Sequence, residues 1–121
     1  MILIVDDNAV NLRLLEAMIT KLGHQCHKAT SAMEAISLFE DRDYDVVLTD
    51  ITMPGMDGFE TAKRMREMEV PRERRARIYA VTASRIDKIQ AKCDSAGLDG
   101  YFTKPFAIES LAFVCKDLEL R

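Results

Sequence analysis

Residues 46–50 read Val-Val-Leu-Thr-Asp, an apolar run that leads through a threonine into a carboxylate. A short continuous apolar run is typical of a buried strand in a parallel sheet, whereas a half-exposed strand would alternate apolar and polar residues. Residues 1–7 (MILIVDD) and 78–82 (IYAVT) repeat the pattern, and each run again ends on polar side chains. Residues 24–29 and 100–102 predict two weaker strands, the first of them near an edge of the sheet.

Each predicted strand is followed by a segment with helical spacing of apolar residues. Asp7 or Asn8 can cap the first helix, and Ser31 with Glu34 forms a capping box at the second. The remaining helices are expected over residues 59–68, over residues 85–96 with a Ser84 cap, and over residues 108–120 with Phe113 in the apolar set. Strands that alternate with helices require a parallel sheet covered on both faces. We therefore expect an α/β fold of five βα units, forming a single domain over residues 1–121.

Composition excludes several classes of protein. No apolar run approaches the roughly 20 residues of a membrane helix, so membrane insertion is not expected. The 17 basic and 20 acidic residues give a net charge of −3, which argues against direct nucleic-acid binding, and the basic run at 72–77 is interpreted as a solvated loop. Three cysteines without a C-x-x-C pair indicate reduced thiols and a cytoplasmic location.

Polar side chains follow four of the predicted strands: Asp6 and Asp7, Asp50, Thr82 and Lys104. In an open α/β sheet, ligands bind at the carboxyl ends of the strands. Three neighbouring carboxylates would raise one another's proton affinity, and a divalent cation relieves the repulsion. Oxygen ligands alone favour Mg²⁺, which also accepts phosphate oxygens. Each residue taken singly is better explained as a cap, turn or surface residue, but their joint occurrence at four strand ends predicts a site.

Four segments carry a resemblance to a known family: IVDDN at 4–8, LTDITMPGMDG at 48–58, AVTA at 80–83 and GLDGYFTKPF at 97–106. Together and in this order, they make the chain similar to the receiver domains of two-component response regulators over nearly its whole length. The resemblance implies a flavodoxin-like (βα)5 three-layer sandwich, with a five-stranded parallel sheet in the order 2-1-3-4-5.

The resemblance also implies a phosphoryl-transfer reaction at the predicted site. Asp50 would be the phosphoacceptor that takes a phosphoryl group from a partner's phosphohistidine. Asp7 and Asp50 would ligate Mg²⁺ together with the backbone carbonyl of Thr52, and Asp6 would hold a metal-bound water. Lys104 would pair with the phosphoryl group. Such a carboxylate nucleophile needs positioning and charge neutralisation more than activation.

A conformational switch is part of the same expectation. Thr82 would reorient to hydrogen-bond the phosphoryl group, and Tyr101 would turn into the space that Thr82 leaves. The alternative is that Tyr101 is a half-buried strand aromatic that does not move. The resemblance further implies a cis peptide between Lys104 and Pro105. On this interpretation the domain is a signalling phosphoacceptor that catalyses its own phosphorylation and dephosphorylation, and it is not otherwise an enzyme.

Residues 7–11 resemble receivers attached to hybrid histidine kinases and phosphorelays, so the expected partner is a histidine kinase or a histidine phosphotransfer protein. Leu12, Pro105 and Phe106 would give that partner apolar contacts. The alternative is that Leu12 is a core residue and Phe106 packs under the last helix. A monomer is favoured. Because the first strand begins with almost no preceding residues, a receiver excised from a longer chain is favoured over a single-domain regulator. If it is excised from a hybrid histidine kinase, the parent chain would be a kinase.

Three alternative functions fit the sequence less well. A degenerate receiver could act as a phosphorylation-independent binding module, but the acid, threonine and lysine set is intact. An aspartyl-phosphate phosphatase would need an Asp-x-Asp pattern and a cap domain, and residues 6–8 read Asp-Asp-Asn. A flavodoxin-type electron carrier would need a phosphate loop rich in Ser, Thr and Gly after the first strand, where this chain has two acids.

Overall fold

The structure, a computed structural model, describes residues 1–69, 75–82, 88–104 and 108–119. Strands and helices alternate along the chain: β1 (Ile2–Val5), α1 (Ala9–Lys21), β2 (Cys26–Ala29), α2 (Ala32–Asp41), β3 (Val46–Asp50), α3 (Gly58–Glu69), β4 (Arg77–Thr82), α4 (Ile89–Ala96), β5 (Gly100–Thr103) and α5 (Ile108–Glu119). The strands form one parallel sheet in the order β2-β1-β3-β4-β5, which confirms the expected fold class and order. No helix within the described ranges has the length and apolarity needed to cross a bilayer.

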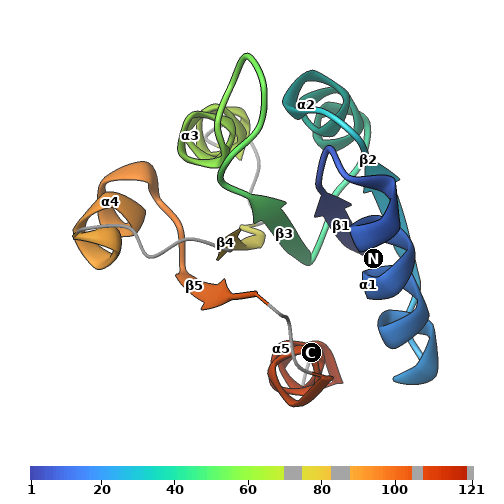
Figure 1. Ribbon diagram of the computed structural model, residues 1–121. Helices are drawn as coiled ribbons and strands as arrows, with labels where there is room; N and C mark the ends of the chain where they lie inside the picture. Colours follow the sequence, from blue (N-terminus) through green and yellow to red (C-terminus); the bar gives the residue numbers. More distant parts are fainter. Residues whose placement is uncertain (70–74, 83–87, 105–107, 120–121) are drawn as a thin grey trace.

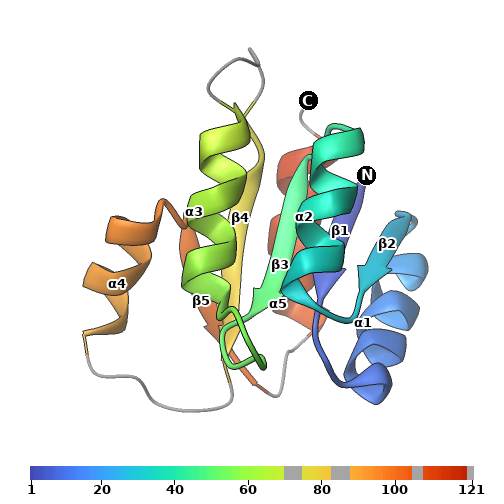
Figure 2. The same cartoon turned by 90° about the horizontal axis from the view of Figure 1, so that it is seen from above.

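The sheet divides the core into two layers, because successive side chains of each strand point to opposite faces. Leu3 and Val5 pack under α2, α3 and α4, whereas Ile2 and Ile4 pack under α1 and α5. Figures 1 and 2 show the two groups of helices on opposite sides of the sheet. All five residues of β3 are buried, which explains the continuous apolar run of that central strand.

The predicted caps of α1 and α2 are observed. The Asn8 side chain accepts hydrogen bonds from the backbone N–H groups of Val10 and Asn11, at 2.9 and 3.2 Å, and so begins α1. The Ser31 hydroxyl accepts from the Glu34 N–H at 3.1 Å and begins α2. These bonds satisfy backbone donors that have no partner within the helix. The chain therefore enters both helices where the sequence indicated.

Two expectations about helices were wrong in detail. The described part of α4 begins at Ile89, not at residue 85, because Lys88 has a left-handed φ of 55° that a right-handed helix cannot contain. Ser84, the expected cap, lies outside the described residues. Phe113 was expected on the apolar face of the last helix, but it is 67% exposed, since α5 turns Leu111 and Val114 toward the sheet instead.

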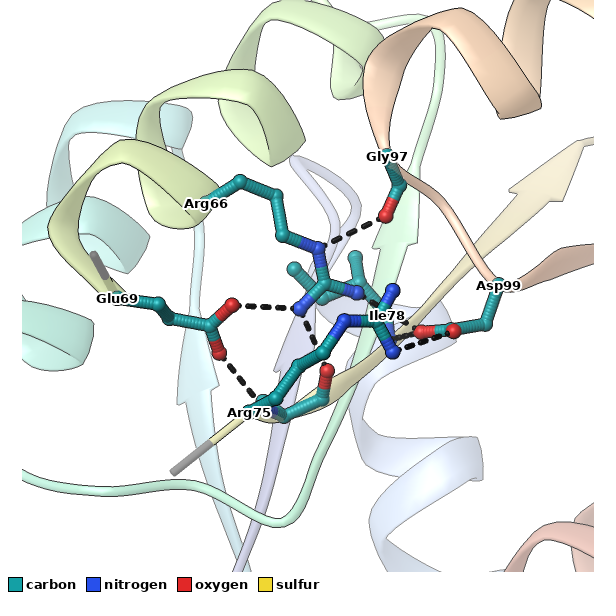
Figure 3. Close-up of polar contacts among 7 residues, drawn as sticks. Arg66, Glu69, Arg75, Ile78, Gly97 and Asp99 are labelled. Carbon is teal, nitrogen blue, oxygen red and sulfur yellow. Dashed lines mark hydrogen bonds and ion pairs between the residues drawn. The ribbon is translucent and has the colours of Figure 1, made fainter. Parts of the chain in front are cut away.

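A partly buried arginine joins α3 to the segment between α4 and β5 (Figure 3). Arg66 donates to the Gly97 carbonyl at 2.8 Å, to Glu69 at 2.7 Å and to Asp99 at 2.8 Å. It also donates to the Ala76 carbonyl at 2.6 Å, just before β4. Asp99 in turn accepts from the Ile78 N–H at 2.8 Å. We call Arg66, Glu69 and Asp99 the Arg66 network; it fixes α3, the start of β4 and the end of α4 relative to one another.

Candidate phosphoacceptor site

The polar residues predicted at the strand ends lie on one edge of the sheet. Asp6 directly follows β1, Asp50 ends β3, Thr82 ends β4 and Lys104 directly follows β5. The parallel register aligns these ends, with Asp50 opposite Val81 and Thr82 opposite Thr103. The topology therefore brings together side chains that are up to 98 residues apart in sequence.

Asp6 is a buried carboxylate whose two oxygens are both hydrogen-bonded. Oδ1 accepts from the Asn8 N–H at 2.9 Å. Oδ2 accepts from the Asn11 side-chain amide at 3.2 Å and from Lys104 Nζ at 3.2 Å. A buried charge is tolerated when it is paired and hydrogen-bonded in this way. Asn11 was not among the residues expected at the site, although its place in the first turn of α1, just after the two acids, is a usable signal.

Asp50 lies beside Asp6 at the end of β3 and is only 8% exposed. Its Oδ1 accepts from the Thr52 N–H at 3.4 Å, and its Oδ2 lies 3.5 Å from Lys104 Nζ. Lys104 is itself fixed because its backbone N–H donates to the Thr82 carbonyl at 2.8 Å. The ammonium group therefore bridges Asp6 and Asp50 and faces the carboxylate that we expect to react.

Gly58 lets the loop after β3 close against Asp50. A Cβ atom at this position would lie 2.5 Å from the Asp50 carbonyl oxygen and 2.9 Å from the Ile51 Cα. The Gly58 N–H donates to the Ile51 carbonyl at 2.9 Å, which holds the start of α3 against the end of β3. The absence of a side chain therefore allows α3 to begin directly against the backbone that carries the acidic group.

Asp7 completes a set of three carboxylates. One oxygen from each of Asp6, Asp7 and Asp50 lies within 4.8 Å of the other two, and only Asp7 is exposed. Oxygen donors that are few in number and open to solvent on one side suit Mg²⁺, which keeps several of its waters. The donor set thus fits the expected magnesium ion. Thr52, expected to contribute its backbone carbonyl, is exposed two residues beyond Asp50.

The pKa of Asp50 is raised above its ordinary value of 3.8. Burial is the largest cause, because it disfavours the charged form; Lys104 opposes the shift and Asp6 adds to it. The expectation that the carboxylates would raise proton affinity thus holds for Asp50, with desolvation as the larger contribution. A bound cation would reverse the balance, because it stabilises the ionised carboxylate.

This shift predicts a pH dependence of stability without divalent cations. The folded state retains the Asp50 proton to higher pH than the unfolded state, so the free energy of unfolding falls as pH rises from the ordinary aspartate range through the raised pKa. Asp50→Asn should remove the part of this decrease in the free energy of unfolding that Asp50 causes. Urea denaturation in EDTA over a pH series measures it. Parallel pH profiles for the two proteins would contradict the assignment.

The two residues of the expected switch occupy neighbouring strands. Thr82 is buried at the end of β4, and Tyr101 on β5 is 38% exposed. Their strands pair in register, with Ala80 opposite Tyr101. Tyr101 therefore lies partly in solvent on β5, and β4, which carries Thr82, separates β5 from the strand that carries Asp50.

The expected partner surface is corrected at one position. Leu12 is only 3% exposed, because it packs under the sheet with Leu15 and cannot offer contact area. Instead, α1 exposes Val10 and Leu14, at 67% and 57%. Pro105 and Phe106 lie outside the described residues. Beside α1, a pocket of about 400 Å³ adjoins the carboxylate site, and its lining includes Leu14, Asp6 and Lys104.

The fold and site define a class of protein: an α/β phosphoacceptor domain with clustered carboxylates and a lysine at the ends of its parallel strands. Residues 2–115 match the family model for the response regulator receiver domain, and the chain belongs to that family. It is 39% identical to the probable histidine kinase 6 of Oryza sativa over 91% of this chain and 13% of that protein. The chain spans only 11% to 13% of the length of the first curated relatives it matches.

Two solved structures are informative. The receiver domain of the sensor histidine kinase PA1611 from Pseudomonas aeruginosa, solved with a magnesium ion coordinated in its active-site cleft, is 32% identical, with a TM-score of 0.83 over 96% of this chain and 93% of that one. The receiver domain of Ssk1 from Saccharomyces cerevisiae, solved with the histidine phosphotransfer protein Ypd1, is 28% identical, with a TM-score of 0.81 over 92% of this chain and 82% of that one. The chain thus resembles both the receiver domain of a sensor histidine kinase and that of a response regulator downstream of a histidine phosphotransfer protein.

Proposed function

We propose that Asp50 accepts a phosphoryl group from a phosphohistidine on a histidine kinase or a histidine phosphotransfer protein. A carboxylate oxygen of Asp50 forms the new O–P bond while the P–N bond to the imidazole breaks, and the imidazole nitrogen leaves with the electron pair and then takes a proton. The observation that carries the proposal is the convergence of three carboxylates within 4.8 Å, with Lys104 Nζ 3.5 Å from Asp50.

The surrounding residues supply positioning and charge. Asp7 and Asp50, with the Thr52 carbonyl, would hold Mg²⁺, and Asp6 would hold one of its waters. When bound, the ion neutralises negative charge on the transferring phosphoryl oxygens. Lys104 already lies beside both buried acids, so its ammonium group can move to a phosphoryl oxygen without a large rearrangement. The PA1611 receiver with its bound magnesium supports this assignment.

The proposal is tested by incubating the protein with acetyl phosphate and Mg²⁺ and recording its intact mass. We expect the gain of one phosphoryl group, and no gain when EDTA replaces Mg²⁺. The phosphodonor carries its own phosphoryl group, so no partner protein is needed. A mass gain of the same size in EDTA would overturn the magnesium-dependent mechanism.

Phosphorylation should also change the environment of Tyr101. The Thr82 hydroxyl would turn toward the new dianion, and the ring of Tyr101 would move into the vacated volume. Tyr101 is partly exposed and Thr82 on the neighbouring strand is buried, which supports an inward movement of the Tyr101 ring. We expect the Tyr101 ring resonances in an NMR spectrum to shift on phosphorylation, and the shift to be lost in Thr82→Ala. Unchanged resonances in the phosphorylated protein would contradict the switch.

The partner would dock on α1 beside the carboxylates. Val10 and Leu14 are exposed there, and an α-helical partner carrying the phosphohistidine could bury them. The complex of Ypd1 with the Ssk1 receiver supports such a partner. Leu14→Glu should slow transfer from a phosphorylated histidine phosphotransfer protein by about tenfold or more and leave phosphorylation by acetyl phosphate unchanged. Equal slowing with both donors would count against docking here.

We also propose that the protein is located in the cytoplasm. All three cysteines are free thiols, and Cys93 and Cys115 are buried in the core. Free thiols are typical of a reducing compartment.

A further inference from the structure

A basic groove lies between α3 and α4, away from the carboxylates. Its volume is about 310 Å³, and it is lined by Phe59, Lys63, Lys88, Ala91, Lys92, Ser95 and Ala96. We call these residues the α3–α4 groove. None of them is acidic. Three lysines therefore surround an apolar floor in a protein whose net charge is −3.

The three lysines form no ion pair with the described part of the chain. No ion pair among the described residues involves Lys63, Lys88 or Lys92, all of which are exposed. Three of the four acidic residues of α3 and α4 have other partners: Glu60 pairs with Arg64, Glu69 with Arg66, and Asp94 accepts from Gln90. The fourth, Glu67, lies four residues after Lys63 on α3, does not line the groove, and forms no ion pair within the described residues. The groove lining thus carries three lysines that form no ion pair with the described part of the chain, and it contains no acidic residue.

One end of the groove is also held by hydrogen bonds. Arg66 on α3 donates to the carbonyl of Gly97, the residue that ends α4. The Arg66 network drawn in Figure 3 therefore fixes the C-terminal end of α4 against α3. A preformed groove binds at a lower entropic cost than one that must be assembled on binding.

We propose that the α3–α4 groove binds an acidic amphipathic segment of a partner protein. Apolar side chains of the segment would cover Phe59, Ala91 and Ala96, and its carboxylates would reach the surrounding lysines. A second copy of the chain cannot occupy the groove with its own α3–α4 groove, because this symmetric contact would place lysines against lysines. A peptide satisfies both the charge and the apolar floor.

The test uses a helical peptide of Glu, Ala and Leu with the leucines on one face, and a matched peptide with Lys in place of each Glu. With ¹⁵N-labelled protein, the acidic peptide should shift the resonances of Lys63, Ala91, Lys92 and Ser95, and the shifts should weaken as salt is added. The basic peptide should leave them unchanged. Shifts confined to another face, or equal binding of both peptides, would overturn the proposal.

The double variant Lys63→Glu/Lys92→Glu should weaken binding of the acidic peptide by about tenfold or more. Its matched control is Lys21→Glu/Lys116→Glu, which makes the same charge change at exposed lysines of α1 and α5, and the control should bind as the parent protein does. Both variants should retain their helical circular dichroism and their phosphorylation by acetyl phosphate. Equal loss of peptide binding in the two variants would overturn the proposal.

The same samples test other occupants. Sedimentation that reports a dimer, with the double variant monomeric, would assign the groove to a second copy of this chain. ATP that shifts the groove resonances at lower concentration than the acidic peptide would assign it to a phosphorylated ligand. Either result would overturn the peptide proposal.

Discussion

Asp50→Asn is expected to abolish phosphoryl uptake from acetyl phosphate in Mg²⁺, with no mass gain under conditions that phosphorylate the parent protein completely. The amide has nearly the same shape as the carboxylate, but it lacks the anionic oxygen that forms the bond to phosphorus. It also removes one of the three charges that would hold Mg²⁺. The loss should therefore be complete, as read by intact mass spectrometry.

Two matched variants separate the acceptor from the other acids. Asp57→Asn changes an exposed acid of the loop that follows β3 and retains the oxygen that accepts from the Glu60 N–H at 2.9 Å, so its mass gain should equal that of the parent protein. Asp7→Asn keeps the acceptor but weakens Mg²⁺ binding by about tenfold or more, so uptake should recover at higher Mg²⁺. A phosphorylated Asp50→Asn protein would show that another residue is the acceptor.

Arg66→Met is expected to lower the free energy of unfolding by about 3 kcal/mol. The methionine leaves the largely buried Glu69 carboxylate without its cation and leaves the carbonyls of Gly97 and Ala76 without their donors. Such groups lose the solvation they would have in the unfolded chain. Arg66→Lys should recover only part of the loss, since one ammonium group cannot supply the forked contacts of a guanidinium. Urea denaturation followed by circular dichroism measures both changes.

Arg64→Met is the control for the Arg66 variants. Arg64 lies on the same helix and pairs with Glu60 at 3.7 Å, but its side chain is 51% exposed, so we expect a change within about 0.5 kcal/mol. The double variant Arg66→Met/Glu69→Met should be more stable than Arg66→Met alone, because it removes the unpaired charge as well. Similar losses for Arg64→Met and Arg66→Met would contradict a structural role for the Arg66 network.

Local patterns explain why much of the site could be predicted from the sequence. A buried strand and the polar residue that ends it are adjacent in the chain, so Asp6, Asp50 and Thr82 could be placed at strand ends before any contact was known. Parallel pairing then required these ends to share one edge. The caps at Asn8 and Ser31 are equally local, because each accepts from a backbone group two or three residues away.

The sequence alone thus determined the alternation of strands and helices and the carboxylates at the strand ends, and its family resemblance supplied the strand order. Only the tertiary structure decided that Leu12 is buried, that Phe113 is exposed, and that Arg66 joins Glu69 to Asp99. The rotation of a helix against the sheet determines which of its apolar residues are covered, and that rotation depends on packing against distant elements. Arg66 and Asp99 are 33 residues apart, so no periodic pattern along the chain connects them.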